Sequence, residues 1–295
     1  MTIVTQGEFT LSKLVLSLLP LVFMNAQTPG ASGFNRAITA SRLPASSGRG
    51  TAASTAPTAA QGKVLPRILS DSHWETTVVL FNTGSASVAF QQFFFAADGK
   101  PSLYTIHAQE ASEEVTASAV QGVLAPSSSL RLVLSDATGA VRDGWSLLTY
   151  DAGPGAVDGY AILRRKGLSA GLDSEVTVAF SSMRDYAVYT PFDNTLGFRS
   201  QLTLVNPAVN LSSQVRLTYR DPQGQVLLID SLILQPQQQM TLVLPDTYPD
   251  LANRSGSVLV EADIDRFSVT GLRCNEAFGA LAALPTMNRS VLLSQ

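Results

Sequence analysis

Hydrophobic and polar residues alternate along several short stretches of this chain. Val215, Leu217 and Tyr219 fall on one side of an extended backbone, and polar or charged residues stand between them. The same period of two recurs in residues 240–244 and 267–271. Because side chains of a β-strand point alternately to opposite faces, this pattern predicts strands with one buried face.

Turn-forming residues separate these stretches. Asp98-Gly99, Asn206-Pro207 and the segment Asp221–Gly224 combine glycine or proline with the short polar residues that favour turns. Short strands at spacings of about ten residues, divided by such turns, predict antiparallel β-sandwiches. Only two short segments are considered helical: residues 109–121, and a single turn at 247–253. The predicted fold class is therefore all-β.

The chain repeats itself at a distance of about 110 residues, which is the size of a domain and not of a solenoid repeat. Thr76–Asn82 resembles Ser200–Asn206, and Leu124–Leu134 resembles Leu234–Leu244. The second pair shares a Leu-x-Pro step, a polar triplet and a Leu-Val-Leu sequence. Two further pairs follow in the same order: 142–149 with 254–261, and 157–160 with 269–272.

This duplication predicts two tandem β-sandwich domains, at residues 64–186 and 187–291. The distance between matching segments changes along the chain, which places an extra segment in the first copy at 109–121. An insertion on a shared scaffold is where one copy gains a contact of its own. We therefore regard 109–121 as the candidate copy-specific surface.

The N-terminal residues read as an export signal. Lys13 precedes an apolar run of 11 residues, Leu14–Met24, and Ala26 stands before a polar break. This run is shorter than the roughly 20 residues that span a bilayer, so 1–26 is predicted to be a cleaved signal peptide. Residues 27–63 are rich in Ala, Ser, Thr, Gly and Pro and are predicted to be a flexible linker. The expected location is secreted, periplasmic or at the cell surface.

Charge and cysteine content narrow the choice of partners. The formal net charge is -3 and charged residues make up 15% of the chain. A nucleic-acid partner would require a clustered basic face, which this sequence lacks. No second apolar run has membrane length, so no membrane span is expected in the mature chain. The single cysteine, Cys274, cannot form an internal disulfide.

The order of strands and turns resembles exported bacterial proteins that carry tandem immunoglobulin-like β-sandwich modules, most of them uncharacterised. The resemblance rests on Asn206-Pro207, Asp221–Gly224, Leu234–Leu244 and Val269–Arg273, with counterparts in the first copy. It covers most of residues 64–291. It implies an adhesive, spacer or carbohydrate-contacting role and carries over no catalytic or binding residues.

One aromatic residue stands out as a candidate ligand contact. Trp74 and Tyr160 have apolar counterparts in the second copy, which is expected of core positions. Trp145 aligns instead with Ser257, so the fold does not require it. We therefore take Trp145 as the candidate sugar-stacking residue on the surface.

The acidic residues offer two weaker candidates. Glu261, Asp263 and Asp265 alternate along a strand and its turn, and their oxygens could bind calcium. The plainer interpretation is a solvated strand face. Asp71 with Glu75 could act as a carboxylate pair in a hydrolase. No other metal site and no cofactor are expected.

A catalytic reading has little support from the sequence. His73 and His107 are the only histidines, and no G-x-S-x-G sequence places a serine nucleophile on a tight turn. The first hypothesis is therefore a non-catalytic structural or adhesive protein that contacts a cell-envelope glycan or another surface protein. The second is a polysaccharide-binding accessory protein, and the third is a hydrolase.

Overall fold

A computed structural model describes residues 39–41, 61–108, 114–135, 142–153, 155–167, 173–182, 186–264 and 266–288. These residues form an all-β structure, as the alternating pattern predicted. Helical structure among them is limited to α1 (Leu244–Thr247) and the 3-10 turn η2 (Pro249–Leu251). The predicted signal peptide lies outside the described residues.

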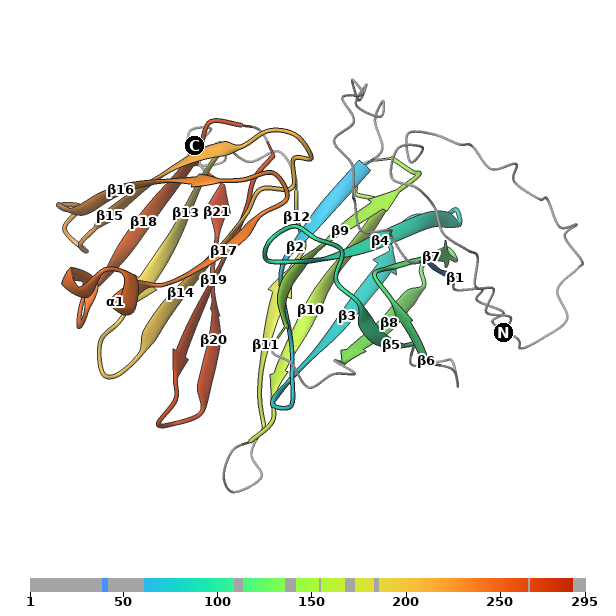
Figure 1. Ribbon diagram of the computed structural model, residues 1–295, viewed down its shortest axis with the longest axis horizontal. Helices are drawn as coiled ribbons and strands as arrows, with labels where there is room; N and C mark the ends of the chain where they lie inside the picture. The colour runs from blue at the N-terminus through green and yellow to red at the C-terminus, as the bar shows by residue number, and fades with distance from the viewer. Residues whose placement is uncertain are drawn as a thin grey trace, which may run out of the picture.

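The first half of the chain forms two six-stranded antiparallel sheets (Figure 1). Sheet A has the order β1-β7-β4-β9-β2-β12, and sheet B has the order β11-β10-β3-β8-β5-β6. The strands of sheet A are β1 (Thr39–Ser41), β7 (Ala119–Leu124), β4 (Val88–Ala96), β9 (Arg142–Tyr150), β2 (Gln61–Ser70) and β12 (Ser181–Ser182). The strands of sheet B are β11 (Ser174–Ala179), β10 (Val157–Arg165), β3 (Trp74–Asn82), β8 (Ser129–Ser135), β5 (Tyr104–Ala108) and β6 (Glu114–Ala117).

The second half forms two smaller antiparallel sheets. Sheet C has the order β16-β15-β18-β13-β21, and sheet D has the order β17-β14-β19-β20. The strands of sheet C are β16 (Val226–Leu234), β15 (Ser213–Arg220), β18 (Ser255–Ala262), β13 (Ala187–Asp193) and β21 (Met287–Asn288). The strands of sheet D are β17 (Gln239–Val243), β14 (Arg199–Val205), β19 (Ser268–Asn275) and β20 (Ala280–Leu284).

The two halves share one strand order. Sheet C repeats sheet A without β1, so that β16, β15, β18, β13 and β21 correspond to β7, β4, β9, β2 and β12. Sheet D repeats sheet B without β5 and β6. We call β2–β12 unit 1 and β13–β21 unit 2. The extra hairpin of unit 1 is therefore β5–β6, which lies at the free side of β8.

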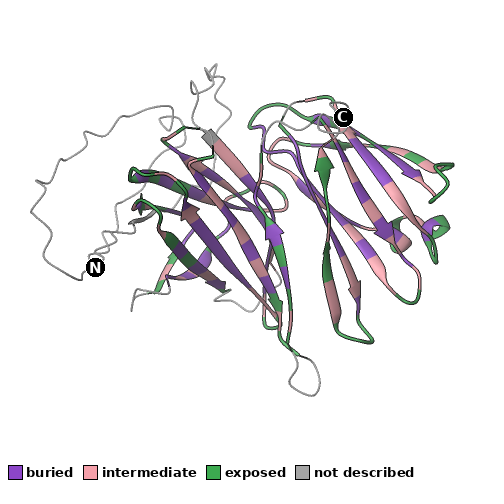
Figure 2. Cartoon of the chain, turned by 180° about the vertical axis from the view of Figure 1, so that it is seen from behind, coloured by how far each residue is buried: buried purple, intermediate pink, exposed green. Residues whose placement is uncertain are grey.

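A hydrophobic core lies between the two sheets of each unit, and the first core also includes Leu272 of β19 in unit 2. In unit 1, buried residues from sheet A such as Phe94 and Leu148 pack with Leu80 and Leu132 from sheet B. In unit 2, the corresponding core joins sheets C and D. Buried positions alternate with more exposed ones along many strands (Figure 2). Burial of these apolar side chains is the main stabilising contribution to each unit.

A buried asparagine marks the same position in both units. Asn82 Nδ2 donates to three carbonyls, those of Ala86, Leu124 and Ala125, at 2.7–3.1 Å. Asn206 Nδ2 does the same with the carbonyls of the residues Leu211, Leu234 and Gln235, at 2.8–3.2 Å. Each side chain ties the end of one strand to two neighbouring loops, and it satisfies carbonyls that burial would otherwise leave unpaired.

The Leu-x-Pro turn is also duplicated in its backbone. Ser127 and Gln237 follow the two matching prolines, and both adopt a left-handed conformation, with φ of 51° and 58°. Such a φ is uncommon for residues other than glycine. Its recurrence at equivalent positions shows that the same strained turn was kept while the side chain changed.

Two equivalent glycines allow close backbone contact. A Cβ added at Gly144 would lie 2.3 Å from the carbonyl oxygen of Phe95, and one at Gly256 would lie 1.9 Å from that of Arg220. Phe95 and Arg220 occupy equivalent strand positions beside β9 and β18. A side chain at either glycine would force the paired strands apart, which explains the matching glycines in the duplicated sequence.

The structure differs from the sequence-based expectation within the predicted linker and at its C-terminal end. Residues 39–41 pair with β7 as strand β1, and β2 already begins at Gln61. A strand can pair through backbone hydrogen bonds without large apolar side chains, so the composition of this segment did not reveal strand β1. The predicted helix at 109–121 is also wrong, since β6 and the start of β7 lie there. Residues 109–113 lie outside the described residues.

Candidate functional site

The candidate ligand residue Trp145 is not on the surface. Its side chain is fully buried, with 0% relative exposure, and it stacks on Phe95 with ring centroids 4.4 Å apart. Its indole Nε1 donates to the carbonyl oxygen of Gln237 in unit 2, at 3.1 Å. With Val64 and Val205 these residues form a small core between the units. The prediction of an exposed sugar-stacking Trp145 is therefore wrong.

Polar contacts complete this junction. Arg67 Nη1 donates to Gln201 Oε1 at 2.8 Å, and its Nη2 contacts Asp143 Oδ2 at 3.3 Å. Gln239 Nε2 donates to the carbonyls of Pro66 and Gly144, both at 2.9 Å. The sequence separations in these contacts between the units exceed 90 residues. The part of the outer face of sheet A around Trp145 and Phe95 is thus bonded to unit 2 and buried.

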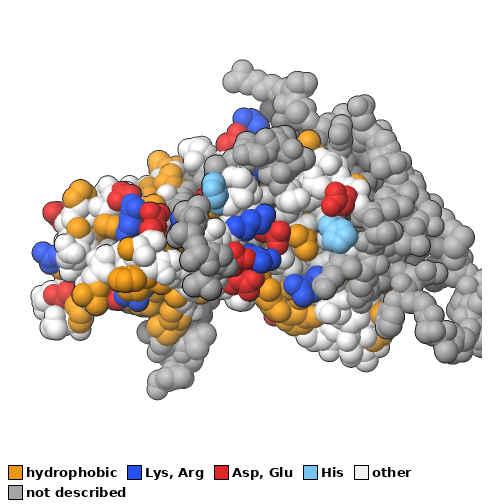
Figure 3. Space-filling model, turned by 90° about the horizontal axis from the view of Figure 1, so that it is seen from below, with side chains coloured by type: hydrophobic (Ala, Val, Ile, Leu, Met, Phe, Trp, Pro, Cys, Tyr) orange, Lys and Arg blue, Asp and Glu red, His pale blue; other side chains and the backbone are white. Residues whose placement is uncertain are grey.

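A groove of about 280 Å³ opens beside this junction. Its walls come from both units, with Trp74 and Arg165 on one side and Cys274 and Glu276 on the other. Arg165 lies over the Trp74 ring at 5.9 Å from its centroid. Cations and carboxylates also gather near the middle of the face seen in Figure 3. The groove therefore combines an indole, guanidinium groups and carboxylates, which can contact a ligand with both donors and acceptors.

Asp143 is one of two titratable groups lining the groove whose pKa is raised, the other being Cys274. Burial raises the pKa of the Asp143 carboxyl above the ordinary value, and the positive charge of Arg67 opposes this rise. The side chain is 30% exposed. Arg67 is only 7% exposed and its Nε has no hydrogen-bond partner. Together they form a partly desolvated ion pair, a type that tends to fix geometry more than it adds stability.

Cys274 on the same groove is a poor nucleophile. Burial raises the pKa of its thiol, which keeps it protonated at neutral pH. Its Sγ lies 3.5 Å from Gln201 Nε2 and 3.6 Å from the carbonyl oxygen of Arg199. The thiol thus serves as a half-buried packing group.

Asp71, one member of the predicted carboxylate pair, is held in a turn beside Ser72 and His73 that does not form a catalytic triad. Asp71 Oδ1 accepts hydrogen bonds from the backbone N–H groups of His73 and Trp74, at 2.5 and 2.7 Å. Ser72 Oγ and Asp71 both approach the same ring nitrogen of His73, Nδ1. A serine–histidine–aspartate triad needs the serine and the carboxylate on opposite ring nitrogens. Asp71 therefore stabilises a turn between β2 and β3.

The predicted calcium residues are not assembled into a metal site within the described part of the chain. Asp263 Oδ1 accepts hydrogen bonds from Ser213 Oγ and the Gln214 backbone N–H, at 3.1 and 2.9 Å. Glu261 lies on β18, paired with Arg216 of β15. No group of three or more metal-ligating side chains occurs among the described residues, and Asp265 lies outside them.

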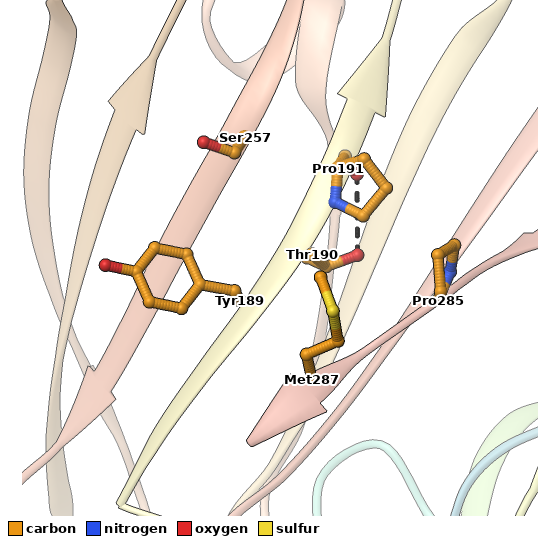
Figure 4. Close-up of a pocket in the computed structure, with 6 residues that line it drawn as sticks. All are labelled: Tyr189, Thr190, Pro191, Ser257, Pro285 and Met287. Atoms are coloured by element: carbon orange, nitrogen blue, oxygen red, sulfur yellow. Dashed lines mark hydrogen bonds between the residues drawn. The ribbon is translucent and has the colours of Figure 1, made fainter. Parts of the chain in front are cut away.

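A second hollow lies on unit 2, between β13, β18 and the segment leading into β21 (Figure 4). Tyr189, Pro191, Pro285 and Met287 line it, and its walls carry no charged side chain. Such a surface can accept a small apolar group, but it holds no acid, base or nucleophile. The chemistry-bearing groups of the two described hollows therefore lie at the junction.

Sequence reasoning missed the residues that build the junction. Arg67, Asp143 and Gln239 come from three distant segments, and no spacing in the sequence links them. One signal was available: Trp145 and Asp143 align with serines in the second copy, at Ser257 and Ser255. A residue that changes from serine to a large or charged side chain between two copies of one fold marks a surface used in only one copy.

Comparison with known protein families, with curated proteins and with solved structures finds no match to this chain. Among the described residues, no helix has the length and apolar character needed to cross a membrane. Function must therefore be argued from the junction, the groove and the exposed sheet surfaces.

Proposed function

We propose that this chain is an exported, non-catalytic structural or adhesive protein whose two immunoglobulin-like units act as one body in the cell envelope or extracellular space. The observation that carries the proposal is the buried junction. Trp145 is fully covered there, and Arg67 and Gln239 bond across it. A protein that serves as a spacer or adhesive element needs a fixed distance between its ends, and such a junction supplies it.

The arrangement of strands supports the immunoglobulin-like assignment. Each unit places one hydrophobic core between two antiparallel sheets. Neighbouring strands within a sheet are often distant in sequence, as where β13 lies between β18 and β21. Crossing between two facing sheets in this way is typical of Greek-key sandwiches. Topology and the sequence resemblance together support the assignment.

The experiment is a pull-down of the purified full chain against insoluble polysaccharides and cell-envelope fractions, with and without calcium. Retention on envelope fractions but on no isolated polysaccharide supports the structural or adhesive role. Cleavage of any polysaccharide, measured as released reducing ends, contradicts a non-catalytic function. Retention that depends on calcium would support a calcium site at Glu261 and Asp263.

Polysaccharide recognition is the second candidate, and the junction groove favours it. Trp74 offers a ring for stacking, and Arg165 and Glu276 offer a donor and an acceptor for sugar hydroxyls. Retention on one polysaccharide should then fall at least tenfold in Trp74→Ala. The matched control is Tyr186→Ala, which removes an aromatic side chain that is 56% exposed and lies outside the groove. Equal loss in both variants would reject the groove as the site.

A further inference from the structure

Strand β16 forms an open edge of sheet C. It pairs with β15 on one side and ends the sheet on the other (Figure 1). Of the eight edge strands in the four described sheets, β16 is the longest, with nine residues. A long edge strand exposes a row of backbone N–H and C=O groups that can bind another strand.

The equivalent edge in unit 1 already carries an added strand. β7 occupies the position in sheet A that β16 occupies in sheet C. β1 pairs with β7 antiparallel, with Thr39 opposite Gln121 and Ser41 opposite Ala119. The shared fold thus accepts a further antiparallel strand at this edge. Within the described residues, sheet C has no strand in that place.

The side chains of β16 leave apolar surface on both faces. Ile229 and Ile233 point outward and are 49% and 59% exposed. Leu228 and Leu232 face the core of unit 2 but are only partly buried. The strand contains no lysine and no proline, the residues that commonly protect an edge from pairing. Its single charge is Asp230.

We propose that β16 is the surface through which two copies of this chain pair, edge to edge and antiparallel, around a twofold axis. Such a contact is isologous, because the same strand is contributed by both copies. It joins the two C sheets into one continuous sheet. This inference goes beyond the proposed function, since the pairing requires neither export nor adhesion.

The charge on β16 selects the register of the pairing. An axis at Asp230 would place two like charges directly opposite each other, which is destabilising. An axis at Ser231 places Ile229 opposite Ile233 of the second copy, and Asp230 opposite Leu232 of that copy. Both apolar pairs then lie on the outer face. We therefore assign the twofold axis to Ser231.

The Asp230 carboxylate is already held by its own unit. Its Oδ2 accepts a hydrogen bond from the Tyr248 hydroxyl at 2.6 Å, and its Oδ1 accepts one from the Ser231 N–H at 2.7 Å. These bonds keep the charge folded toward unit 2, away from the outer face that carries the isoleucines. Edge pairing at Ser231 exchanges the N–H bond to Asp230 Oδ1 for one to the second copy, whereas the Tyr248 hydroxyl still holds the carboxylate toward unit 2, away from Ile229 and Ile233.

The test is sedimentation equilibrium of the full chain over a hundredfold range of concentration. The expected result is a reversible monomer–dimer equilibrium. Ile233→Lys should weaken dimerisation at least tenfold, because the lysine would stand opposite Ile229 of the second copy. Met287→Lys is the matched control: Met287 lies on the opposite edge strand of the same sheet and is 48% exposed. Its dimerisation should match that of the unchanged chain.

The register is tested by cysteine crosslinking in a Cys274→Ser background. Ser231→Cys should form a covalent dimer on mild oxidation, and Ile233→Cys should not, because it faces Ile229. Circular dichroism and thermal unfolding confirm that each variant is folded. A chain that remains monomeric at every concentration overturns the proposal. A dimer that Ile233→Lys leaves unchanged, or that crosslinks equally through both cysteines, overturns it as well.

Discussion

Sheets A and C are two copies of one sheet with different surroundings. Their strands follow the same order, and their glycines at 144 and 256 make the same close contact with a neighbouring strand. Around Trp145, the outer face of sheet A is covered by unit 2, whereas the outer face of sheet C carries the open hollow at Tyr189 and Met287. The comparison separates what the fold requires from what the junction requires.

Residues at equivalent places show this division directly. Trp145 corresponds to Ser257, and Phe95, on which the indole stacks, corresponds to Arg220. The large aromatic pair occurs where the face is buried, and small or charged residues occur where it is open. The outer face of sheet A thus carries large aromatic side chains where it contacts unit 2, while the strand order is the same in both units.

The largest effect is expected when Trp145 of unit 1 is replaced by serine, the residue at the equivalent position of unit 2. Trp145→Ser should cost about 3–5 kcal/mol, the range for removal of a large buried aromatic side chain. Because the loss falls on the junction, the two units should then unfold in separate steps. Differential scanning calorimetry should show two transitions in place of one.

The reciprocal site provides the control for this prediction. Ser257→Ala removes a hydroxyl from the open face of sheet C and should change stability by less than about 0.5 kcal/mol. A Trp145→Ser protein that still unfolds in one step would contradict the role of the junction. A large effect of Ser257→Ala would show that the two outer faces are not as different as the structure indicates.

The buried asparagines Asn82 and Asn206, unlike the junction residues, are the same in both units. Asn82→Ala and Asn206→Ala each leave three carbonyls without their donor, and each should cost about 3 kcal/mol. Urea unfolding of the two variants measures both losses. A difference between them larger than about 1.4 kcal/mol, a factor of ten in the equilibrium constant, would mean that the units do not share this network.

Much of the fold could be predicted because it depends on local and repeated features. The period of two gave the strands, and the repeated Leu-x-Pro segments located β8 with β17 in the two sheets. The alternation of Val215, Leu217 and Tyr219 correctly assigned their side chains to the core. These features rest on the pleat of one strand, which neighbouring sequence determines.

The junction and groove could not be predicted in the same way. Trp145 was predicted to lie on the surface because its counterpart is Ser257, but the sequence could not distinguish an open face from one covered by another unit. Contacts such as that of Arg67 with Gln201 join segments more than 130 residues apart. Their formation depends on how two folded units pack, and no local pattern encodes that geometry.

A smaller effect is expected for Gln239, the first residue of β17, which donates hydrogen bonds across the junction. Strand β17 is the counterpart of β8 in unit 1. Gln239→Leu leaves the carbonyls of Pro66 and Gly144 without their side-chain donor and should cost about 1–2 kcal/mol. Its counterpart in unit 1 is Ser129, which is exposed, so Ser129→Ala should have almost no effect. Chemical denaturation of both variants tests this contrast, and equal losses would count against a junction-specific role.

The smallest effect concerns pH and Asp143, whose counterpart in unit 2 is Ser255. Burial raises the pKa of Asp143 in the folded protein above its unfolded value, so folding favours the protonated carboxyl. Its stabilising contribution is complete below the unfolded pKa, near 3.9, and is lost as pH rises through the folded value. Relative to Asp143→Asn, the unchanged chain should lose stability as pH rises between the unfolded and the folded pKa of Asp143, by less than about 1.4 kcal/mol per pH unit.

Urea unfolding of both proteins at each pH measures this difference in the free energy of unfolding. A difference that stays flat, or that grows in favour of the unchanged chain as pH rises, would show that Arg67 outweighs burial and that the junction holds a stabilising ion pair.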